Sequence, residues 1–134
     1  MHLHPEASNG IYSYLSEGMG TRIIDRLAKA TTKEAGGSGR TRRPAMAVHP
    51  GGPRILGAVK RSILPRGWPK DALQHSESTF SRYGNLGSTA SLVVLHDMLQ
   101  DENALKDHDD LGVMAFGPGV TVEYAVLRRN PHGL

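Results

Sequence analysis

The stretch AMAVHPGGP, residues 45–53, decides how the rest of the chain is interpreted. Its first four residues form a continuous apolar run, which is typical of a strand buried on both faces. The run ends at His49, so we expect this side chain at the carboxyl end of a strand, where open α/β sheets bind ligands. Pro50-Gly51-Gly52 allows a tight turn, and Pro53 suits the first position of a helix that continues to Ile63. The stretch therefore predicts a strand, a turn and a helix, with a histidine at the ligand-binding edge.

Apolar spacing outward from this stretch predicts the remaining elements of the fold. The helix over 88–100 carries an apolar surface too broad for a single stripe, so we expect it to be largely buried. Its first turn, over 87–90, consists of small residues that permit close approach of a ligand. The other expected elements are a loose end over 1–9, a strand over 11–15, a helix over 19–28, an exposed connection over 31–43, a short helix over 73–82, and a hairpin with strands over 111–116 and 120–127 joined by a turn over 117–119.

This order of elements predicts the fold class. Strands and helices alternate first, and two adjacent strands close the chain, so we expect an α/β arrangement with a layered mixed sheet, flanking helices and a C-terminal antiparallel hairpin. The length of 134 residues fits one domain, which we assign to residues 10–134.

Composition and charge exclude several classes of function. The formal net charge of +3 comes from scattered cations, with one cluster over 40–43 that we interpret as a solvated loop. No basic stripe with interleaved aromatic residues is present, so we predict no nucleic-acid partner. The acidic stretch over 101–110 lacks the pattern of a calcium loop and is interpreted as solvated. The sequence shows no signal-peptide core and no apolar run of membrane length, which predicts a cytoplasmic protein without a membrane partner.

The residues also argue against a bound metal. The chain contains no cysteine, which excludes disulfides and thiolate metal sites within it. Six histidines share no ligand-like spacing with one another or with a carboxylate pair, so we expect no metal site: His2, His4, His75, His96, His108 and His132.

A second motif, Tyr83-Gly84-Asn85, precedes the helix over 88–100. Taken singly, His49 is typical of a structural histidine beside a turn, and Asn85 is typical of a helix N-cap. Together, a histidine and an asparagine that converge offer two neutral hydrogen-bond donors, which is what the enolate oxygen formed from a thioester requires. The two motifs in one small domain therefore favour an active site.

Three segments carry a resemblance to a known family: AVHPGGPRIL over 47–56, YGNLGSTASLVVLHDML over 83–99 and AFGPGVTVEYAVLRR over 115–129. In this order and at these spacings they resemble the C-terminal half of the chalcone and stilbene synthases, the type III polyketide synthases. The resemblance implies a thiolase-like fold, of which this chain is the second of two related halves. It also implies an acyltransferase activity that condenses an acyl-CoA starter with malonyl-CoA, with no cofactor beyond these substrates.

The resemblance assigns roles to individual residues. It implies that His49 and Asn85 hold the thioester carbonyl of malonyl-CoA during decarboxylation and stabilise the tetrahedral intermediates of acyl transfer. The substrate-binding residues that it implies are Gly52, Pro53 and Arg54 against the pantetheine arm of coenzyme A, and Gly87 with the turn Phe116-Gly117-Pro118-Gly119 around the cyclisation cavity. Gly87 stands where the family commonly has a serine.

The absence of cysteine is the main departure from the family pattern. In the family, the nucleophilic cysteine and most cationic coenzyme A contacts belong to an N-terminal portion. The resemblance therefore implies two kinds of partner, coenzyme A thioesters and either a cysteine-bearing N-terminal half or a second copy of the chain. The alternative hypothesis is a non-catalytic, truncated remnant or an interaction module.

Overall fold

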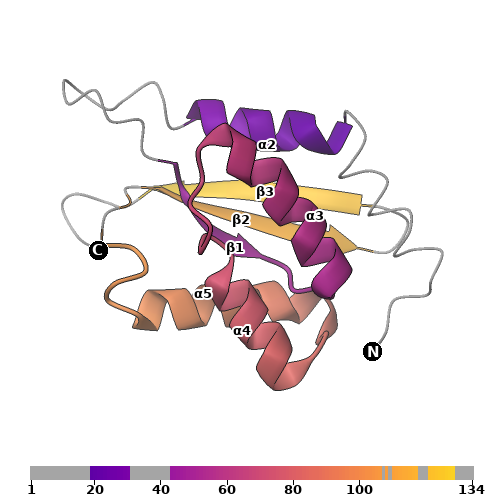
Figure 1. Cartoon of the computed structure of the whole chain (residues 1–134). Coiled ribbons are helices and arrows are strands. Elements are labelled where there is room, and N and C mark those ends of the chain that lie inside the picture. The colour runs from indigo at the N-terminus through magenta and orange to yellow at the C-terminus, as the bar shows by residue number, and fades with distance from the viewer. Residues whose placement is uncertain (1–18, 31–42, 107, 109, 118–120, 129–134) are drawn as a thin grey trace.

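A computed structural model describes residues 19–30, 43–106, 108, 110–117 and 121–128. Its sheet has three strands in the order β1-β2-β3 (Figure 1). Strand β1 (Ala45–Val48) pairs in parallel with β2 (Asp110–Gly117), and β2 pairs antiparallel with β3 (Thr121–Arg128). The mixed sheet and its C-terminal hairpin confirm the predicted fold class. The expected loose end over 1–9, the strand over 11–15 and most of the turn over 117–119 lie outside the described residues.

The helices follow the apolar spacing of the sequence closely. Pro53 occupies the first turn of its helix, as predicted, because its fixed φ suits that position and its missing N–H leaves no bond unmade. The helices are α2 (Met19–Ala30), α3 (Pro53–Ile63), α4 (Gln74–Tyr83) and α5 (Ala90–Gln100), with short 3₁₀ turns η1 (Leu64–Arg66) after α3 and η2 (Gly87–Thr89) before α5.

The sheet separates two apolar clusters, with α2 and α5 on opposite sides of it (Figure 1). Alternation along β1 sends Met46 and Val48 into the cluster formed with α2 and α3, and sends Ala45 and Ala47 into the cluster formed with α5. The small alanines leave room for α5 to approach β1 closely, because successive strand residues face opposite sides.

Helix α4 contacts β1, and in Figure 1 both elements run toward the same end of the sheet. Residues 71, 72, 74 and 75, around the start of α4, line a pocket together with residues 44–46 at the start of β1. Further along both elements, the backbone N–H of Val48 donates to the hydroxyl oxygen of Ser76 at 3.2 Å. The helix ends at Gly84, which takes a φ of 69° that favours glycine, and Asn85 follows. Helix α4 thus brings Asn85 toward the end of the sheet at which β1 delivers His49.

The prediction that the helix over 88–100 is largely buried is wrong. Ala90, Val94 and Met98 of α5 are buried, but Leu92 and Leu99 are 62% and 59% exposed. The buried partners of α5 in its cluster come from β1 and β2, and α4 also packs against α5, whereas the side that carries Leu92 and Leu99 is left exposed in the described part of the chain. The broad apolar surface therefore marks a helix with one covered side and one open side.

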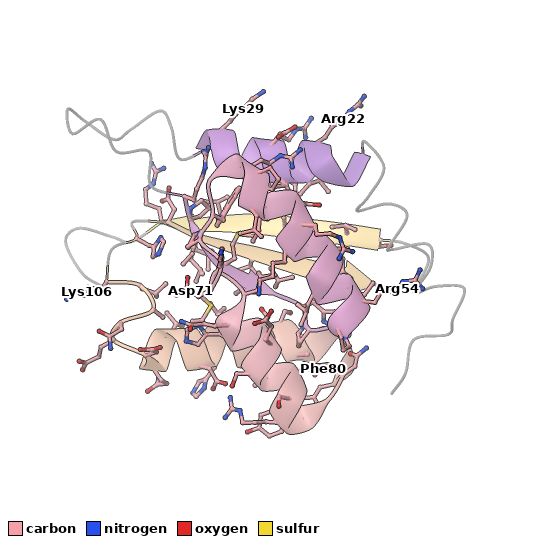
Figure 2. All side chains as sticks on the ribbon, viewed as in Figure 1. Arg22, Lys29, Arg54, Asp71, Phe80 and Lys106 are labelled. Carbon is pink, nitrogen blue, oxygen red and sulfur yellow. The ribbon has the colours of Figure 1, made fainter. Side chains whose placement is uncertain are left out.

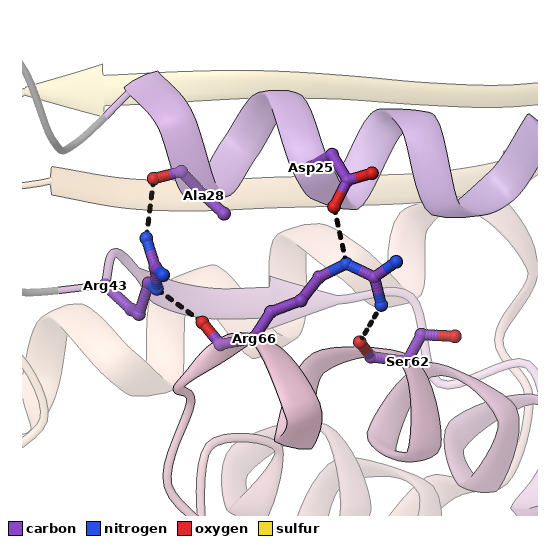
Figure 3. Close-up of polar contacts among 5 residues, drawn as sticks. All are labelled: Asp25, Ala28, Arg43, Ser62 and Arg66. Carbon is purple, nitrogen blue, oxygen red and sulfur yellow. Dashed lines mark hydrogen bonds and ion pairs between the residues drawn. The ribbon is translucent and has the colours of Figure 1, made fainter.

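The interpretation of the basic cluster as a solvated loop is wrong for Arg43, the one member that the structure describes (Figure 3). Its guanidinium donates to the carbonyl oxygens of Ala28 and Arg66 at 2.7 and 2.6 Å, and it lies over the Trp68 ring. Arg66 in turn donates to Asp25 of α2 at 2.6 Å. These contacts, which we call the arginine latch, join α2 to the start of β1 and to η1.

The acidic stretch is also less solvated than predicted, because Asp110 belongs to β2. Its carboxylate is 7% exposed and accepts two hydrogen bonds from Arg128 on β3, at 2.8 and 3.2 Å. Separately, no helix within the described ranges is both long and apolar enough to cross a membrane.

Candidate active site

His49 lies at the carboxyl end of β1, as the sequence predicts. Its backbone N–H donates to the carbonyl oxygen of Met114 at 2.8 Å, so the residue continues the pairing between β1 and β2. Its side chain is 2% exposed, and its ring meets the ring of Phe116 edge to face, with 6.0 Å between centroids. The neighbouring strand thus fixes the backbone of His49, and Phe116 packs against one side of its ring.

Burial controls the charge of this histidine. Desolvation penalises the imidazolium form and lowers the pKa of His49 below its ordinary value. A neutral imidazole offers one donor and one acceptor, so His49 can donate a hydrogen bond without adding a positive charge to the site. The nitrogen Nδ1 is buried and makes no hydrogen bond to any residue that the structure describes.

The turn after His49 requires its glycines. A Cβ on Gly51 would lie 3.3 Å from Cδ2 of His49, which is tighter than ordinary side-chain contact. Gly52 has a φ of 138°, a backbone conformation that other residues rarely adopt. Pro53 and Arg54 then begin α3 and are exposed, and Figure 2 shows Arg54 at the outer edge of the molecule. Gly52, Pro53 and Arg54, which are expected to contact the pantetheine arm, therefore lie on the turn that follows His49 and on the start of α3.

Asn85 closes a turn before η2, whose N-cap residue is Leu86. The side-chain oxygen of Asn85 accepts a hydrogen bond from the backbone N–H of Gly87 at 2.9 Å, and Gly87 has a φ of 75°. The oxygen is therefore held by the chain, and the two hydrogens on Nδ2 are left to be donated elsewhere. The N-cap interpretation of Asn85 is wrong, because Leu86 and Thr89 hold the N-cap positions of η2 and α5. The observed turn and the donor role are compatible, because they use different atoms of one amide group.

The remaining predicted site residues are divided between the core and the undescribed ranges. Phe116 is 5% exposed and belongs to the apolar cluster under α2 and α3, whereas Gly117 is half-buried at the end of β2. Pro118 and Gly119 lie outside the described residues. A cavity-lining role for this turn stays a prediction.

The structure assembles the site from two groups of residues. One group surrounds His49 and comprises the glycine turn, the start of α3 and Phe116. The other group surrounds Asn85, after α4, and η2 of this group packs near β2. Because α4 and β1 run in the same direction, both groups lie toward one end of the sheet. A single oxygen shared by His49 and Asn85 stays a prediction.

Within the described residues, no group of three or more histidine or carboxylate side chains is arranged to hold a metal ion. His75 donates to Asp101 at 2.9 Å and His108 contacts the carbonyl oxygen of Arg43, so both serve the packing of α4 and of the start of β1. At the predicted site, the side chains of His49 and Asn85 can donate hydrogen bonds as neutral groups.

Sequence reasoning missed Ser76 and Thr79 on α4. Both side chains are completely buried, although serine and threonine are most often exposed. Their spacing of three residues puts them on one side of the helix, and this helix immediately precedes the asparagine motif. This spacing could have indicated a buried polar pair. In the sequence alone, however, it looks the same as an exposed polar face, because the sequence does not show which side of α4 faces β1.

Comparison with protein families matches residues 6–131 to the family described as "Chalcone and stilbene synthases, C-terminal domain". Among curated proteins, the chain is 32% identical over 126 residues to "Alpha-pyrone synthesis polyketide synthase-like Pks18" of Mycobacterium tuberculosis. A protein of the same description in Mycobacterium bovis matches equally well. The match covers 90% of this chain and 31% of either relative, so the chain spans about a third of their length.

Solved structures agree on the fold. The type III polyketide synthase domain of Steely1 from Dictyostelium superposes with a TM-score of 0.68 at 19% identity, over 94% of this chain and 32% of that one. A type III pentaketide synthase from Neurospora crassa gives a TM-score of 0.66 at 21% identity, over 96% of this chain and 33% of that one. These likenesses confirm the predicted thiolase-like architecture.

Proposed function

Since the chain belongs to the chalcone and stilbene synthase family, of which it carries the C-terminal domain, we propose that it supplies the enolate-stabilising part of an acyltransferase site. The substrates of that site are coenzyme A thioesters. His49 and Asn85 are the two donors, and Gly52, Pro53 and Arg54 form the wall along the pantetheine arm. The buried, neutral His49 at the end of β1 is the observation that carries the proposal.

The proposed step is decarboxylation of a malonyl thioester. The bond between the carboxylate and the methylene carbon breaks, carbon dioxide leaves, and the electron pair moves onto the thioester oxygen as an enolate. Nε2–H of His49 and Nδ2–H of Asn85 donate to that oxygen. When the methylene carbon takes a proton, an acetyl thioester forms; when it attacks an acyl thioester, a carbon–carbon bond forms and the thiolate leaves.

Preorganised neutral donors suit this step because negative charge on the oxygen exists mainly in the transition state and the enolate. A donor that is already held in place needs no reorganisation as the charge develops. A cationic donor would stabilise the enolate more strongly but would also slow its onward reaction. The burial that keeps His49 neutral therefore supports the proposed role.

Release of carbon dioxide from malonyl-CoA by the 134-residue chain tests the proposal. We expect slow release that falls by about 10²-fold in His49→Ala and in Asn85→Asp, the usual effect of losing one oxyanion donor. Asn85→Asp is informative because its carboxylate keeps the acceptor for Gly87 and loses both donors. His96→Ala is the matched control, since the His96 side chain is 70% exposed on α5.

Equal rates in all four proteins would contradict the donor assignment. No carbon–carbon bond is expected from this chain alone, because it contains no cysteine to hold the acyl group as a thioester. A polyketide product from the purified chain would overturn that part of the proposal.

A second function, that of a non-catalytic interaction module, is favoured by two observations. The sequence has no cysteine, and α5 exposes two leucines at a spacing of seven residues, which places them on one face of the helix. Decarboxylation that depends on His49 separates the two functions, because an interaction module has no need of either donor.

A further inference from the structure

Two buried polar atoms among the described residues make no hydrogen bond: Nδ1 of His49 and the hydroxyl oxygen of Thr79. The two side chains are 2% and 0% exposed. Leaving a buried donor or acceptor unpaired destabilises the folded state, so such groups are rare in folded proteins. Two unpaired groups that lie on neighbouring elements therefore call for a common explanation.

The course of α4 places Thr79 beside the end of β1. Ser76 meets Val48 through the hydrogen bond from the strand N–H. Thr79 follows on the same side of the helix, about 4.5 Å farther along its axis. His49 follows Val48 by one residue, about 3.3 Å farther along the strand. Because α4 and β1 run in the same direction, the advance along the helix and the advance along the strand bring Thr79 next to His49.

The Thr79 hydroxyl is not used within its own helix. Buried serine and threonine hydroxyls in helices often donate to the carbonyl one turn earlier. Ser62 on α3 does so, donating to Ala58 at 3.0 Å. Thr79 makes no such bond, so its proton is available to an acceptor outside α4.

The two groups are chemically complementary. A neutral imidazole that donates through one nitrogen must present a lone pair at the other. Nδ1 is the enclosed nitrogen, whereas Nε2 lies toward the glycine turn, close to the position that a Cβ on Gly51 would take. Donation from Nε2 therefore requires a lone pair on Nδ1, and that lone pair requires a donor.

We propose that Thr79 is a positioning residue for His49: its hydroxyl donates to Nδ1, directly or through one water, and holds the ring in the Nε2–H tautomer. The use of that Nε2–H as an enolate donor rests on the proposed function. The pairing itself rests on the two buried atoms and on the course of α4.

The tautomer can be measured without any catalysis. Nitrogen-15 NMR of the histidine rings in the 134-residue chain separates Nε2–H from Nδ1–H forms, and a His49→Gln variant identifies the His49 signals. We expect the Nε2–H form in the unmodified chain. In Thr79→Val, which keeps the shape and removes the hydroxyl, the ratio of Nε2–H to Nδ1–H should fall about fivefold, the effect of losing one ordinary hydrogen bond.

Two further variants make the result specific. Thr79→Ser restores a hydroxyl and should restore the Nε2–H form. Ser62→Ala removes a hydroxyl that bonds within its own helix and should leave the His49 tautomer unchanged. Thr79→Val keeps the shape of the buried side chain, so we expect it to fold, with a free energy of unfolding lowered by the loss of one hydrogen bond.

A predominant Nδ1–H form in the unmodified chain, or the same tautomer ratio in Thr79→Val, would overturn the pairing. An equal change in Ser62→Ala would also overturn it, since the effect would then be general. If the ratio responds to Thr79 as expected while the unmodified chain releases no carbon dioxide from malonyl-CoA, the pairing stands and the proposed function fails.

Discussion

His49 shows how one buried residue acquires a chemical character that its exposed counterparts lack. Its backbone is fixed by β2, its ring is packed against Phe116, and both effects come from its place at a strand end. Desolvation then lowers its pKa, so the neutral ring is the form present near neutral pH. The lowered pKa of His49 therefore comes from its buried position at the end of β1 and not from a charged neighbour.

The lowered pKa of His49 predicts a pH-dependent stability. Below about pH 6.5 the histidine of the unfolded chain takes up a proton, whereas the folded state resists protonation until a lower pH. The unfolded state then binds more protons, so the free energy of unfolding falls as the pH drops through this window. We expect urea denaturation to show a larger loss between pH 7.5 and pH 5.5 in the unmodified chain than in His49→Gln.

The chosen window lies above the range in which Asp25 and Asp101 titrate, because hydrogen bonds lower the pKa of both carboxyls further. His96→Gln, at an exposed position, should lose as much stability as the unmodified chain. Parallel losses in the unmodified chain and in His49→Gln would show that burial does not control this histidine.

The sequence identified His49 and Asn85 because each sits in a short motif with glycine, and such motifs are local. It did not identify Thr79, because a partner across two elements depends on which side of α4 meets β1. It also missed that the Asn85 oxygen is committed to Gly87. The places of His49 and Asn85 in the fold were thus predictable from local motifs, whereas their hydrogen-bond partners were not.

At the scale of elements, the arginine latch attaches α2 to the rest of the domain. Arg43 stands just before β1 and satisfies the carbonyl of Ala28 in the last turn of α2, where carbonyls lack helical partners. The same guanidinium bonds the carbonyl of Arg66 in η1. One side chain therefore bridges the end of a helix and a 3₁₀ turn that are far apart in sequence.

Replacing Arg43 with lysine should weaken this attachment. A single ammonium lacks the planar fork that reaches both carbonyls and stacks on Trp68. We expect Arg43→Lys to lower the free energy of unfolding by about 1.5–3 kcal/mol, the usual worth of charged hydrogen bonds. Urea denaturation measures the loss, and amide exchange should be fastest in α2.

Arg22→Lys is the matched control, because Arg22 points away from α2 into solvent (Figure 2). Equal stability of the two lysine variants would show that the latch contributes nothing.

Most elements were predictable because their signals are local. The bounds of β1 and the start of α3 follow from an apolar run that ends at a proline and glycine turn, and the hairpin follows from alternation. The exposure of α5 and the burial of Arg43 were not predictable, because both depend on what packs against them. An apolar stretch of sequence shows that a surface can be buried, but it does not show whether another element packs against that surface.

At the scale of the whole molecule, an apolar face extends from α5 across to β3. Leu92 and Leu99 of α5 and Leu127 of β3 are exposed, and Leu99 and Leu127 line a pocket of about 240 Å³ whose walls are mainly leucines. Val122 and Val126 of β3 do not belong to this face, because both pack partly against the cluster under α2 and α3.

We predict that the 134-residue chain associates through this face. Covering a few hundred square ångströms at about 25 cal/mol per Å² gives several kcal/mol in favour of association. Size-exclusion chromatography should show oligomers or poor recovery, and Leu92→Ser combined with Leu99→Ser should shift the chain toward monomer. A cysteine-bearing N-terminal half of a relative, added in trans, should improve solubility.

Leu64→Ser is the control for this experiment, since Leu64 is 37% exposed in η1, away from the face. A stable monomer that ignores the added half would contradict the prediction and favour a self-sufficient domain.

The parallel course of α4 and β1 also bears on how accurately the two donors can be placed. Ser76 ties the helix to the strand one residue before His49, and the same helix ends two residues before Asn85. The distance between the two proposed donors therefore depends on the position of a single helix rather than on the conformations of two separate loops. Substitutions far from either donor that shift the whole of α4 should therefore change the distance between the two donors without altering either side chain.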